Sequence, residues 1–288
     1  TNPNQLISAI IEAKQNGLKT ALYPRPRFLE EAGKWFTEAP RDFAWWVTWF
    51  DRYRYFLLNF ADLAQQNRVN ALILGGDWLE PALPYGTLPD GSSSGVPEDA
   101  EVRWRTLLQE VRSRFSGMLI WALAYPAGIQ NAPPFLDAVD ALYVEWSAAL
   151  ADQPGASEAD MAGRAAELLD NDLLSFQQRW NKPLILAVSY PSVLGGSTGC
   201  LPKAEGGCWA IQDLDQPNPD LPEPTLNLAD QANAYNALLL AINERQWISG
   251  FVSQGFYPAL PLQDKSASLH GKPASGVLWF WYPRLLGK

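Results

Sequence analysis

Two carboxylates stand in apolar segments of the chain, where an ionised side chain is costly unless it has a partner or a polar cavity. Asp77 ends an apolar run in NALILGGDW (70–78), and Glu145 lies within ALYVEWSAAL (141–150). Pairs of carboxyl groups perform general acid–base and nucleophilic catalysis. Glycoside hydrolysis uses such a pair, about 5–5.5 Å apart for retention and roughly 6.5–9.5 Å apart for inversion. These two residues are therefore the candidate catalytic pair.

The segment before Asp77 predicts a strand that delivers this carboxylate to a cleft. Its apolar run lacks alternation, which is typical of a strand covered on both faces in a parallel sheet. The carboxyl ends of such strands form the active site in barrel and doubly wound folds. A carboxylate beside the indole of Trp78 suits a sugar. The alternative is that Gly75 and Gly76 form a tight turn and Asp77 only caps the next element of the chain.

Glu145 lies inside a predicted strand. Strand alternation places Tyr143, Glu145 and Ser147 on one face, from which Glu145 would complete a pair with Asp77. The alternative is a structural carboxylate that is paired with Arg25 or Arg27. Those two arginines either bind a carboxylate or a substrate hydroxyl, or are solvated loop charges.

Further candidate substrate contacts come after the predicted strands. The aromatic faces of Trp78 and Tyr190 suit stacking on a sugar ring, and Gln254 and Tyr257 suit hydrogen bonds to hydroxyls. Ser189 is excluded as a hydrolase nucleophile, because no GxSxG motif surrounds it and the single histidine lies well past the last strand.

The elements needed to position these residues alternate along the whole chain. We expect one domain over residues 1–288, of the α/β class and (β/α)8 TIM-barrel-like. Six strand–helix units are visible, so either two strands lie upstream of Thr1 or the barrel is open or incomplete. Strands are expected at 18–23, 70–78, 118–125, 141–150, 183–190 and 250–257, and the main helices at 4–15, 45–66, 98–115, 157–180, 229–247 and 273–286.

Several of these segments, spread over most of the chain, resemble the clan of (β/α)8 glycoside hydrolases that includes the family 113 β-mannanases. They are WWVTWF to GGDW (45–78), FLDAVDALYVEWSAAL (135–150), KPLILAVSYPS (182–192), QANAYNALLLAINERQWISGFVSQGFYP (231–258) and GKPASGVLWFWYPRLLG (271–287). The resemblance makes 18–23 the third barrel strand. It places Asp77 where the family has its acid–base glutamate, and Ala187 where the family has its nucleophilic glutamate. Because an alanine side chain cannot attack an anomeric carbon, Glu145 or an upstream residue has to complete the pair.

Composition limits the partners. The net charge is −9 with no basic stripe, so nucleic acid is not expected, and no apolar segment is long enough to span a membrane. Cys200 and Cys208 share one loop, which predicts a disulfide and an extracellular or cell-surface location; two free thiols are the alternative. No metal or other cofactor is expected. The oligomeric state is open.

The leading hypothesis is a glycoside hydrolase that acts on a polysaccharide or oligosaccharide. The rival is a catalytically inactive barrel that binds glycans or a protein partner. A third hypothesis is a scaffold subunit of an extracellular assembly, which a large apolar surface patch would favour.

Overall fold

The computed structural model describes residues 2–209, 214–217, 221, 223–257 and 263–287. The chain divides into two compact units, the N-terminal unit Thr1–Tyr143 and the C-terminal unit Val144–Lys288. The main sheet has the strand order β1-β2-β3-β4-β5-β8, and helices alternate with these strands along the chain. This alternation is that of an α/β fold. A single domain over 1–288 stays a prediction.

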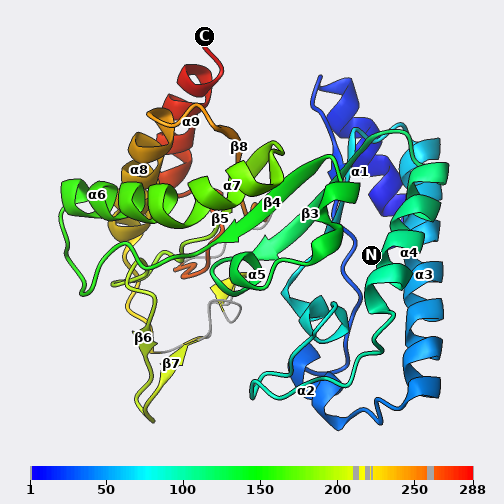
Figure 1. Cartoon of the computed structure of the whole chain (residues 1–288). Coiled ribbons are helices and arrows are strands. Elements are labelled where there is room, and N and C mark those ends of the chain that lie inside the picture. The colour runs from blue at the N-terminus through cyan, green and yellow to red at the C-terminus, as the bar shows by residue number, and fades with distance from the viewer. Residues whose placement is uncertain (1, 210–213, 218–220, 222, 258–262, 288) are drawn as a thin grey trace. The chain divides into compact units, whose positions relative to one another are not determined.

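In the N-terminal unit, parallel strands alternate with helices (Figure 1). Strand β1 pairs with β2, and β2 pairs with β3 in a register from Ala71↔Met118 to Gly75↔Ala122. The elements of this unit are α1 (Pro3–Gln15), β1 (Ala21–Leu22), α2 (Ala32–Glu38), α3 (Phe43–Gln66), β2 (Ala71–Gly75), the 3-10 helix η1 (Asp77–Ala82), α4 (Ala100–Arg114), β3 (Met118–Ala124), α5 (Ala127–Gln130) and the 3-10 helix η2 (Pro134–Ala138).

Helix α3 forms because a capping residue precedes a regular apolar stripe. Asp42 is its N-cap, and the Asp42 side chain accepts a hydrogen bond from the backbone of Trp45 at 2.8 Å. The buried side recurs at helical spacing and consists of Trp46, Phe50, Tyr53, Leu57, Leu58, Ala61 and Ala64. Helix α3 packs against α4 and β2. The predicted helix at 45–66 is thereby confirmed.

Trp104 lies at the centre of the core of this unit. Its indole is fully buried, and its Nε1 donates to the carbonyl of Ala82 at 2.8 Å. The ring contacts Phe50 of α3, Trp121 of β3 and Phe135 of η2 at centroid distances of 5.8, 5.4 and 5.7 Å. One tryptophan therefore ties two helices, a strand and the turn after that strand together.

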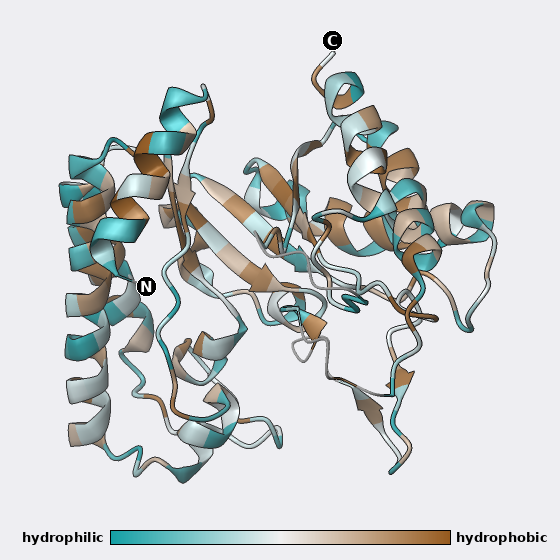
Figure 2. Ribbon diagram, turned by 180° about the vertical axis from the view of Figure 1, so that it is seen from behind, coloured by the Kyte–Doolittle hydropathy of each residue, from teal (hydrophilic) through white to brown (hydrophobic). Residues whose placement is uncertain are grey.

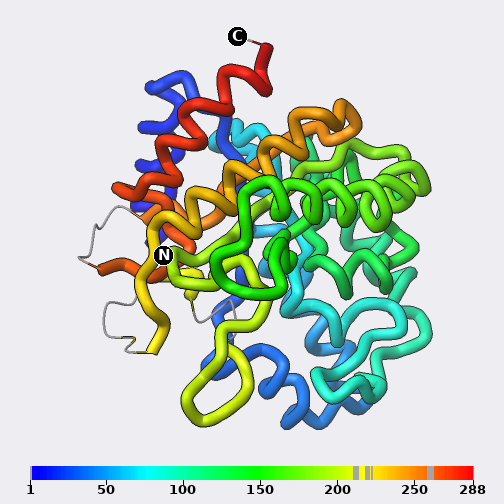
Figure 3. Tube along the Cα trace, turned by 90° about the vertical axis from the view of Figure 1, so that its left-hand side faces the viewer, coloured from blue at the N-terminus to red at the C-terminus, as the bar shows by residue number. Residues whose placement is uncertain are grey.

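The C-terminal unit repeats the alternation. Strand β4 (Ala141–Trp146) crosses the boundary between the units, and β5 pairs in parallel with β8. Helix α8 packs against both α6 and α9 (Figures 1 and 3). Strands are mainly hydrophobic in Figure 2, whereas helices alternate hydrophilic and hydrophobic residues. The remaining elements are α6 (Glu158–Leu168), the π-helix η3 (Leu169–Leu173), α7 (Leu174–Trp180), β5 (Leu184–Val188), β6 (Leu201–Pro202), β7 (Cys208–Trp209), α8 (Leu228–Asn243), β8 (Ile248–Ser253) and α9 (Pro273–Leu285).

The observed elements match the predicted ones in order, and most differ only at their ends. The predicted strand at 18–23 is reduced to Ala21–Leu22, and the one at 141–150 ends at Trp146. Several short elements were not predicted, η1 and α5 among them. Helix α2 lies in a short segment between prolines, and the β6–β7 hairpin lies in the long cysteine loop. Both segments are too short for hydrophobic periodicity to reveal them.

Candidate active site

Two glycines set the position of Asp77. Gly75 and Gly76 have φ of 89° and 118°, a region that residues other than glycine rarely adopt. A Cβ on Gly75 would lie 2.5 Å from the carbonyl oxygen of Ala122 on the neighbouring strand. The chain therefore leaves β2 in a conformation restricted to glycine, and Asp77 becomes the first residue of η1.

Asp77 is exposed at the carboxyl end of β2, as the sequence predicted for its strand. Its Oδ1 accepts a hydrogen bond from the backbone N–H of Trp78 at 2.8 Å. This contact orients the carboxylate and also agrees with a role in capping the short helix. A catalytic role for Asp77 stays a prediction.

A cation and an aromatic ring lie against Trp78, the residue that follows Asp77. The guanidinium of Arg25 lies 4.7 Å from the ring centroids of both Tyr23 and Trp78, and these two centroids are 5.5 Å apart. Tyr143 contacts Tyr23 edge-on at 5.9 Å. Cation–π contacts of this kind orient an arginine that is exposed to solvent. Arg25 is therefore held on the aromatic residues that come after β1 and β2.

Trp78 is largely enclosed, with 9% of its surface exposed. A Cβ at Gly76 would lie 2.3 Å from its ring, so the indole packs directly on the glycine turn. Within the described part of the chain, its buried Nε1–H has no hydrogen-bond partner. Such a donor costs free energy until it finds an acceptor. Trp78 therefore combines a packed ring with an unused donor next to Asp77.

The exposure pattern of β4 agrees with the predicted alternation only from Val144 onward, because Tyr143, on the predicted face of Glu145, is buried. Val144 and Trp146 are buried, whereas Glu145 and Ser147 are partly exposed. Glu145 therefore lies on the more open side of its strand. Both interpretations of Glu145, as a catalytic group and as a structural carboxylate, stay predictions.

Tyr190 lies where β4 and β5 end. Its hydroxyl accepts a hydrogen bond from Trp146 Nε1 at 2.9 Å and donates to the carbonyl of Ala148 at 2.8 Å. The side chain is 1% exposed, and its ring contacts Tyr235. In this arrangement Tyr190 fastens the ends of the two strands to each other.

The carboxyl ends of β5 and β8 lie next to each other. Gln254 comes directly after β8, and its backbone N–H donates to the carbonyl of Val188 at 2.8 Å. Gln254 and Tyr257 are partly exposed, and the Tyr257 carbonyl contacts His270 Nδ1 at 2.6 Å. Ala187 is fully buried in β5. The two polar side chains therefore lie beyond β8, at the edge where the carboxyl ends of both strands meet.

One carboxylate near the end of β5 was not predicted. Asp215 belongs to the long loop between β5 and α8, and its Oδ1 accepts a hydrogen bond from Ser189 Oγ at 3.4 Å. The preceding residue, Leu214, is buried, and its carbonyl accepts from the N–H of Ala267 at 2.8 Å. No motif marks Asp215. The only sequence signal was its place in a long loop on the carboxyl side of the sheet.

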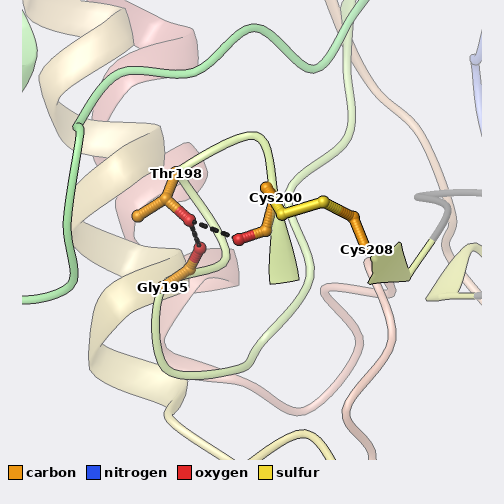
Figure 4. Close-up of a disulfide and its surroundings, with 4 residues drawn as sticks. All are labelled: Gly195, Thr198, Cys200 and Cys208. Carbon is orange, nitrogen blue, oxygen red and sulfur yellow. Dashed lines mark hydrogen bonds between the residues drawn. A yellow bond between two sulfur atoms is a disulfide. The ribbon is translucent and has the colours of Figure 1, made fainter. Parts of the chain in front are cut away.

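The same loop carries the predicted disulfide, which the structure confirms between Cys200 and Cys208 (Figure 4). It joins the residue before β6, Cys200, to the first residue of β7, Cys208. Thr198 Oγ1 bonds to the carbonyls of Gly195 and Cys200 at 2.8 and 3.1 Å, which fixes the turn before the hairpin. Residues 210–213, 218–220 and 222 of the predicted loop lie outside the described residues.

Metal-binding clusters and membrane-spanning helices are absent from the described part of the chain. Among these residues, no group of three or more His, Cys, Asp or Glu side chains is arranged to hold a metal ion. None of the described helices has the length and apolar character needed to cross a bilayer.

Comparison with known proteins finds structural relatives. No protein-family model matches the sequence, and no curated protein matches it significantly. A solved structure of a GH113 β-1,4-mannanase is similar over 98% of this chain and 79% of its own, with a TM-score of 0.69 and 21% identity. A GH113 β-mannanase from Alicyclobacillus acidocaldarius, in complex with ManMIm, is similar over 98% and 78%, with a TM-score of 0.66 and 20% identity.

These relatives define the fold class. The described residues form six strands of a main sheet with the fold of an incomplete (β/α)8 barrel. The expected resemblance to family 113 β-mannanases is confirmed for the fold. At this level of identity it does not extend to the chemistry, so the replacement of the nucleophile at Ala187 stays a prediction.

Proposed function

We propose that this chain is a carbohydrate-active domain, a glycoside hydrolase that uses Asp77 and Glu145 on a polysaccharide or oligosaccharide. The supporting observation is the exposed Asp77 at the carboxyl end of β2, in a fold that is similar to GH113 β-mannanases over 98% of the chain. In barrel enzymes, active sites lie at this end of the strands.

The proposed chemistry needs one carboxyl group to protonate the leaving glycosidic oxygen. The other carboxylate attacks the anomeric carbon or activates a water molecule, depending on the separation of the two groups. Asp77 takes one of these roles and Glu145 the other. Arg25, held on Tyr23 and Trp78, offers a positive charge and hydrogen-bond donors to a substrate hydroxyl.

The remaining candidates supply substrate contacts. Trp78 is assigned a stacking contact with a sugar ring, and Gln254 and Tyr257 offer side-chain hydrogen bonds to sugar hydroxyls. Arg27, which was predicted to bind a hydroxyl or a carboxylate, is exposed and lines a pocket that does not include Asp77. Tyr190 contributes by holding the strand ends in place, as its two hydrogen bonds within the C-terminal unit suggest.

The test is the release of reducing sugar from a panel of β-linked polysaccharides. Asp77→Asn and Glu145→Gln are each expected to lose at least about a hundredfold in turnover, in line with the loss of a general acid or base. Asp51→Asn and Glu12→Gln, which change exposed residues on helices, serve as controls. Full activity in both site variants would end the proposal.

A non-catalytic, glycan-binding barrel is the second candidate. The observation that favours it is Ala187, which is fully buried in β5 at the position that resembles the nucleophile of the family. This alternative predicts saturable glycan binding without any turnover, measured by calorimetry and by reducing-sugar assay on the same sample.

We also propose an extracellular or cell-surface location, which the Cys200–Cys208 disulfide supports. Thiol labelling of protein from its native source, without reduction, is expected to leave both cysteines unmodified. Labelling of both would refute this location.

A further inference from the structure

A pocket of about 660 Å³ lies within the N-terminal unit, and neither Asp77 nor Glu145 lines it. It is bounded by residues 26–29 after β1, by α2 and by the first half of α3. Its volume is in the range typical of small-molecule sites, about 300–1,000 Å³. No function was expected for this face from the sequence, and only Arg27 among its lining residues was a candidate for binding.

The walls of the pocket are aromatic. Trp35, Trp45 and Trp49 line it and are each partly exposed. The rings of Trp35 and Trp45 lie 5.6 Å apart, and Trp49 stacks on Tyr53 at 5.1 Å with planes 10° apart. These rings are therefore available to a ligand while packed against one another.

A second layer of rings holds these tryptophans in place. Phe36 and Trp46 are fully buried, and Phe50 is 5% exposed. Phe36 contacts Trp35, and Trp46 contacts Trp45 and Trp49, at centroid distances between 4.8 and 5.8 Å. A binding surface whose rings are fixed before the ligand arrives loses less conformational entropy on binding.

Two arginines and one carboxylate set the charge of the pocket. Arg27 and Arg52 both line it, and both are exposed. Within the described residues neither has a carboxylate at ion-pair distance. Asp42 lines the pocket as well, and its Oδ1 accepts a hydrogen bond from the backbone N–H of Trp45 as the cap of α3.

These two arginines differ from many others in the same unit. Arginines elsewhere in the N-terminal unit are matched with carboxylates, in the pairs Arg54–Glu110, Arg103–Asp99, Arg105–Asp137, Arg112–Asp140 and Arg114–Asp62. The chain as a whole carries a net charge of −9. With two arginines against one carboxylate beside partly exposed tryptophans, the pocket therefore favours an anionic ligand with a ring that can stack.

From this geometry we propose that the pocket binds an acidic sugar, a uronate residue within an oligosaccharide. The sugar ring stacks on Trp45 or Trp49, and its carboxylate accepts hydrogen bonds from Arg27 and Arg52, whose planar guanidinium groups match a carboxylate. The ring of the uronate accounts for the exposed tryptophan faces in the pocket, and its carboxylate accounts for the two arginines. The site binds without cleaving, so it does not depend on the proposed hydrolase activity.

The test is a titration of the purified chain with oligogalacturonate and with neutral cello-oligosaccharide of the same length, followed by tryptophan fluorescence and calorimetry. Binding of the acidic oligosaccharide is expected to saturate, to be at least about tenfold tighter than that of the neutral one, and to weaken as salt is raised, because exposed charges are screened. Equal affinity for the two sugars, or no saturable binding of the acidic one, overturns the proposal.

Variants locate the site. Arg27→Gln and Arg52→Gln are each expected to weaken acidic binding roughly tenfold to a hundredfold, the usual range for a hydrogen bond to a charged group. Arg54→Gln is the matched control, because Arg54 lies on the same helix as Arg52 but pairs with Glu110. Unchanged binding in both Arg27→Gln and Arg52→Gln contradicts the proposal.

Two further results separate this site from the catalytic pair and from self-association. Asp77→Asn and Glu145→Gln are expected to bind the acidic oligosaccharide as the wild type does, whatever their hydrolytic activity. Ultracentrifugation checks for a second copy of the chain in the pocket. A dimer that Trp45→Ala dissociates would assign the pocket to self-association and refute the uronate site.

Discussion

The buried ion pair between Asp264 and Lys272 leads to a sharp prediction about stability. Their side chains are 7% and 5% exposed, and Asp264 Oδ2 lies 3.0 Å from Lys272 Nζ. The ammonium also donates to Ser192 Oγ at 2.8 Å and to the carbonyl of Ser266 at 2.7 Å. Asp264 Oδ1 accepts from the N–H of Ser266 at 2.9 Å. This network joins the start of α9 to the segment that comes after β5.

Asp264→Asn removes the negative charge and leaves a buried ammonium without its counter-ion. Breaking one side of a buried pair costs about 3–5 kcal/mol, a large share of the roughly 5–15 kcal/mol that stabilises a typical domain. The double variant Asp264→Asn/Lys272→Met removes both charges, and we expect it to lose less than the single variant does.

The same pair predicts a dependence on pH. Burial lowers the pKa of Lys272, against the opposing effect of Asp264. In Asp264→Asn the pKa of Lys272 falls further. The folded variant therefore releases the Lys272 proton at a lower pH than the unfolded variant does. The unfolded state then binds more protons, and the free energy of unfolding rises with pH up to the ordinary lysine value of 10.5. The deficit of Asp264→Asn should therefore shrink as the pH is raised from neutrality.

The assay is urea denaturation, monitored by circular dichroism and tryptophan fluorescence at neutral and alkaline pH. Wild type and the double variant provide the references. The reasoning is refuted if the free energy of unfolding of Asp264→Asn lies within about 1 kcal/mol of the wild-type value at neutral pH. Such a difference changes the folding equilibrium constant by less than about tenfold. A deficit that grows with pH would refute its electrostatic part.

Three other substitutions test the packing around the candidate site. Gly75→Ala forces a Cβ to 2.5 Å from the carbonyl of Ala122 at a positive φ, so we expect a loss of about 2 kcal/mol or more in thermal unfolding and impaired function at Asp77; wild-type stability would contradict this. Burial raises the pKa of Tyr235 above its ordinary value of 10.0. Above pH 10 only the unfolded state loses the tyrosine proton, so the free energy of unfolding should fall as the pH rises. Tyr235→Phe should make this decline smaller. Trp104→Phe removes one buried indole hydrogen bond and should cost about 1–3 kcal/mol in urea denaturation, so a stabilised variant would count against its central role.

Much of the fold could be predicted because it depends on patterns within single segments. The long helix α3 carries an apolar stripe and a capping Asp42, and β2 is an apolar run that ends in two glycines. Helix α2 and the β6–β7 hairpin were missed because segments this short show no hydrophobic periodicity. Their conformations depend on contacts with distant parts of the chain, such as the packing of α2 against η1.

The site was predictable only in part. The sequence indicated that Asp77 comes after a strand, since that strand has a local signature. Nothing in the sequence marked Asp215, which reaches Ser189 across 26 positions, or the pocket between α2 and α3. The Ser189–Asp215 contact and the pocket both form between segments that are apart in the sequence. No pattern within a single segment indicates which residues come into contact.

The sequence by itself determined the order of strands and helices, the disulfide between Cys200 and Cys208, and the position of Asp77 after a buried strand. These depend on periodicity, loop length and the conformational freedom of glycine, all of which are local. Only the tertiary structure decided that Arg25 lies against Tyr23 and Trp78, that Tyr190 is enclosed, and that two arginines face an aromatic pocket. Those properties depend on desolvation and on contacts between segments distant in sequence, and folding alone creates them.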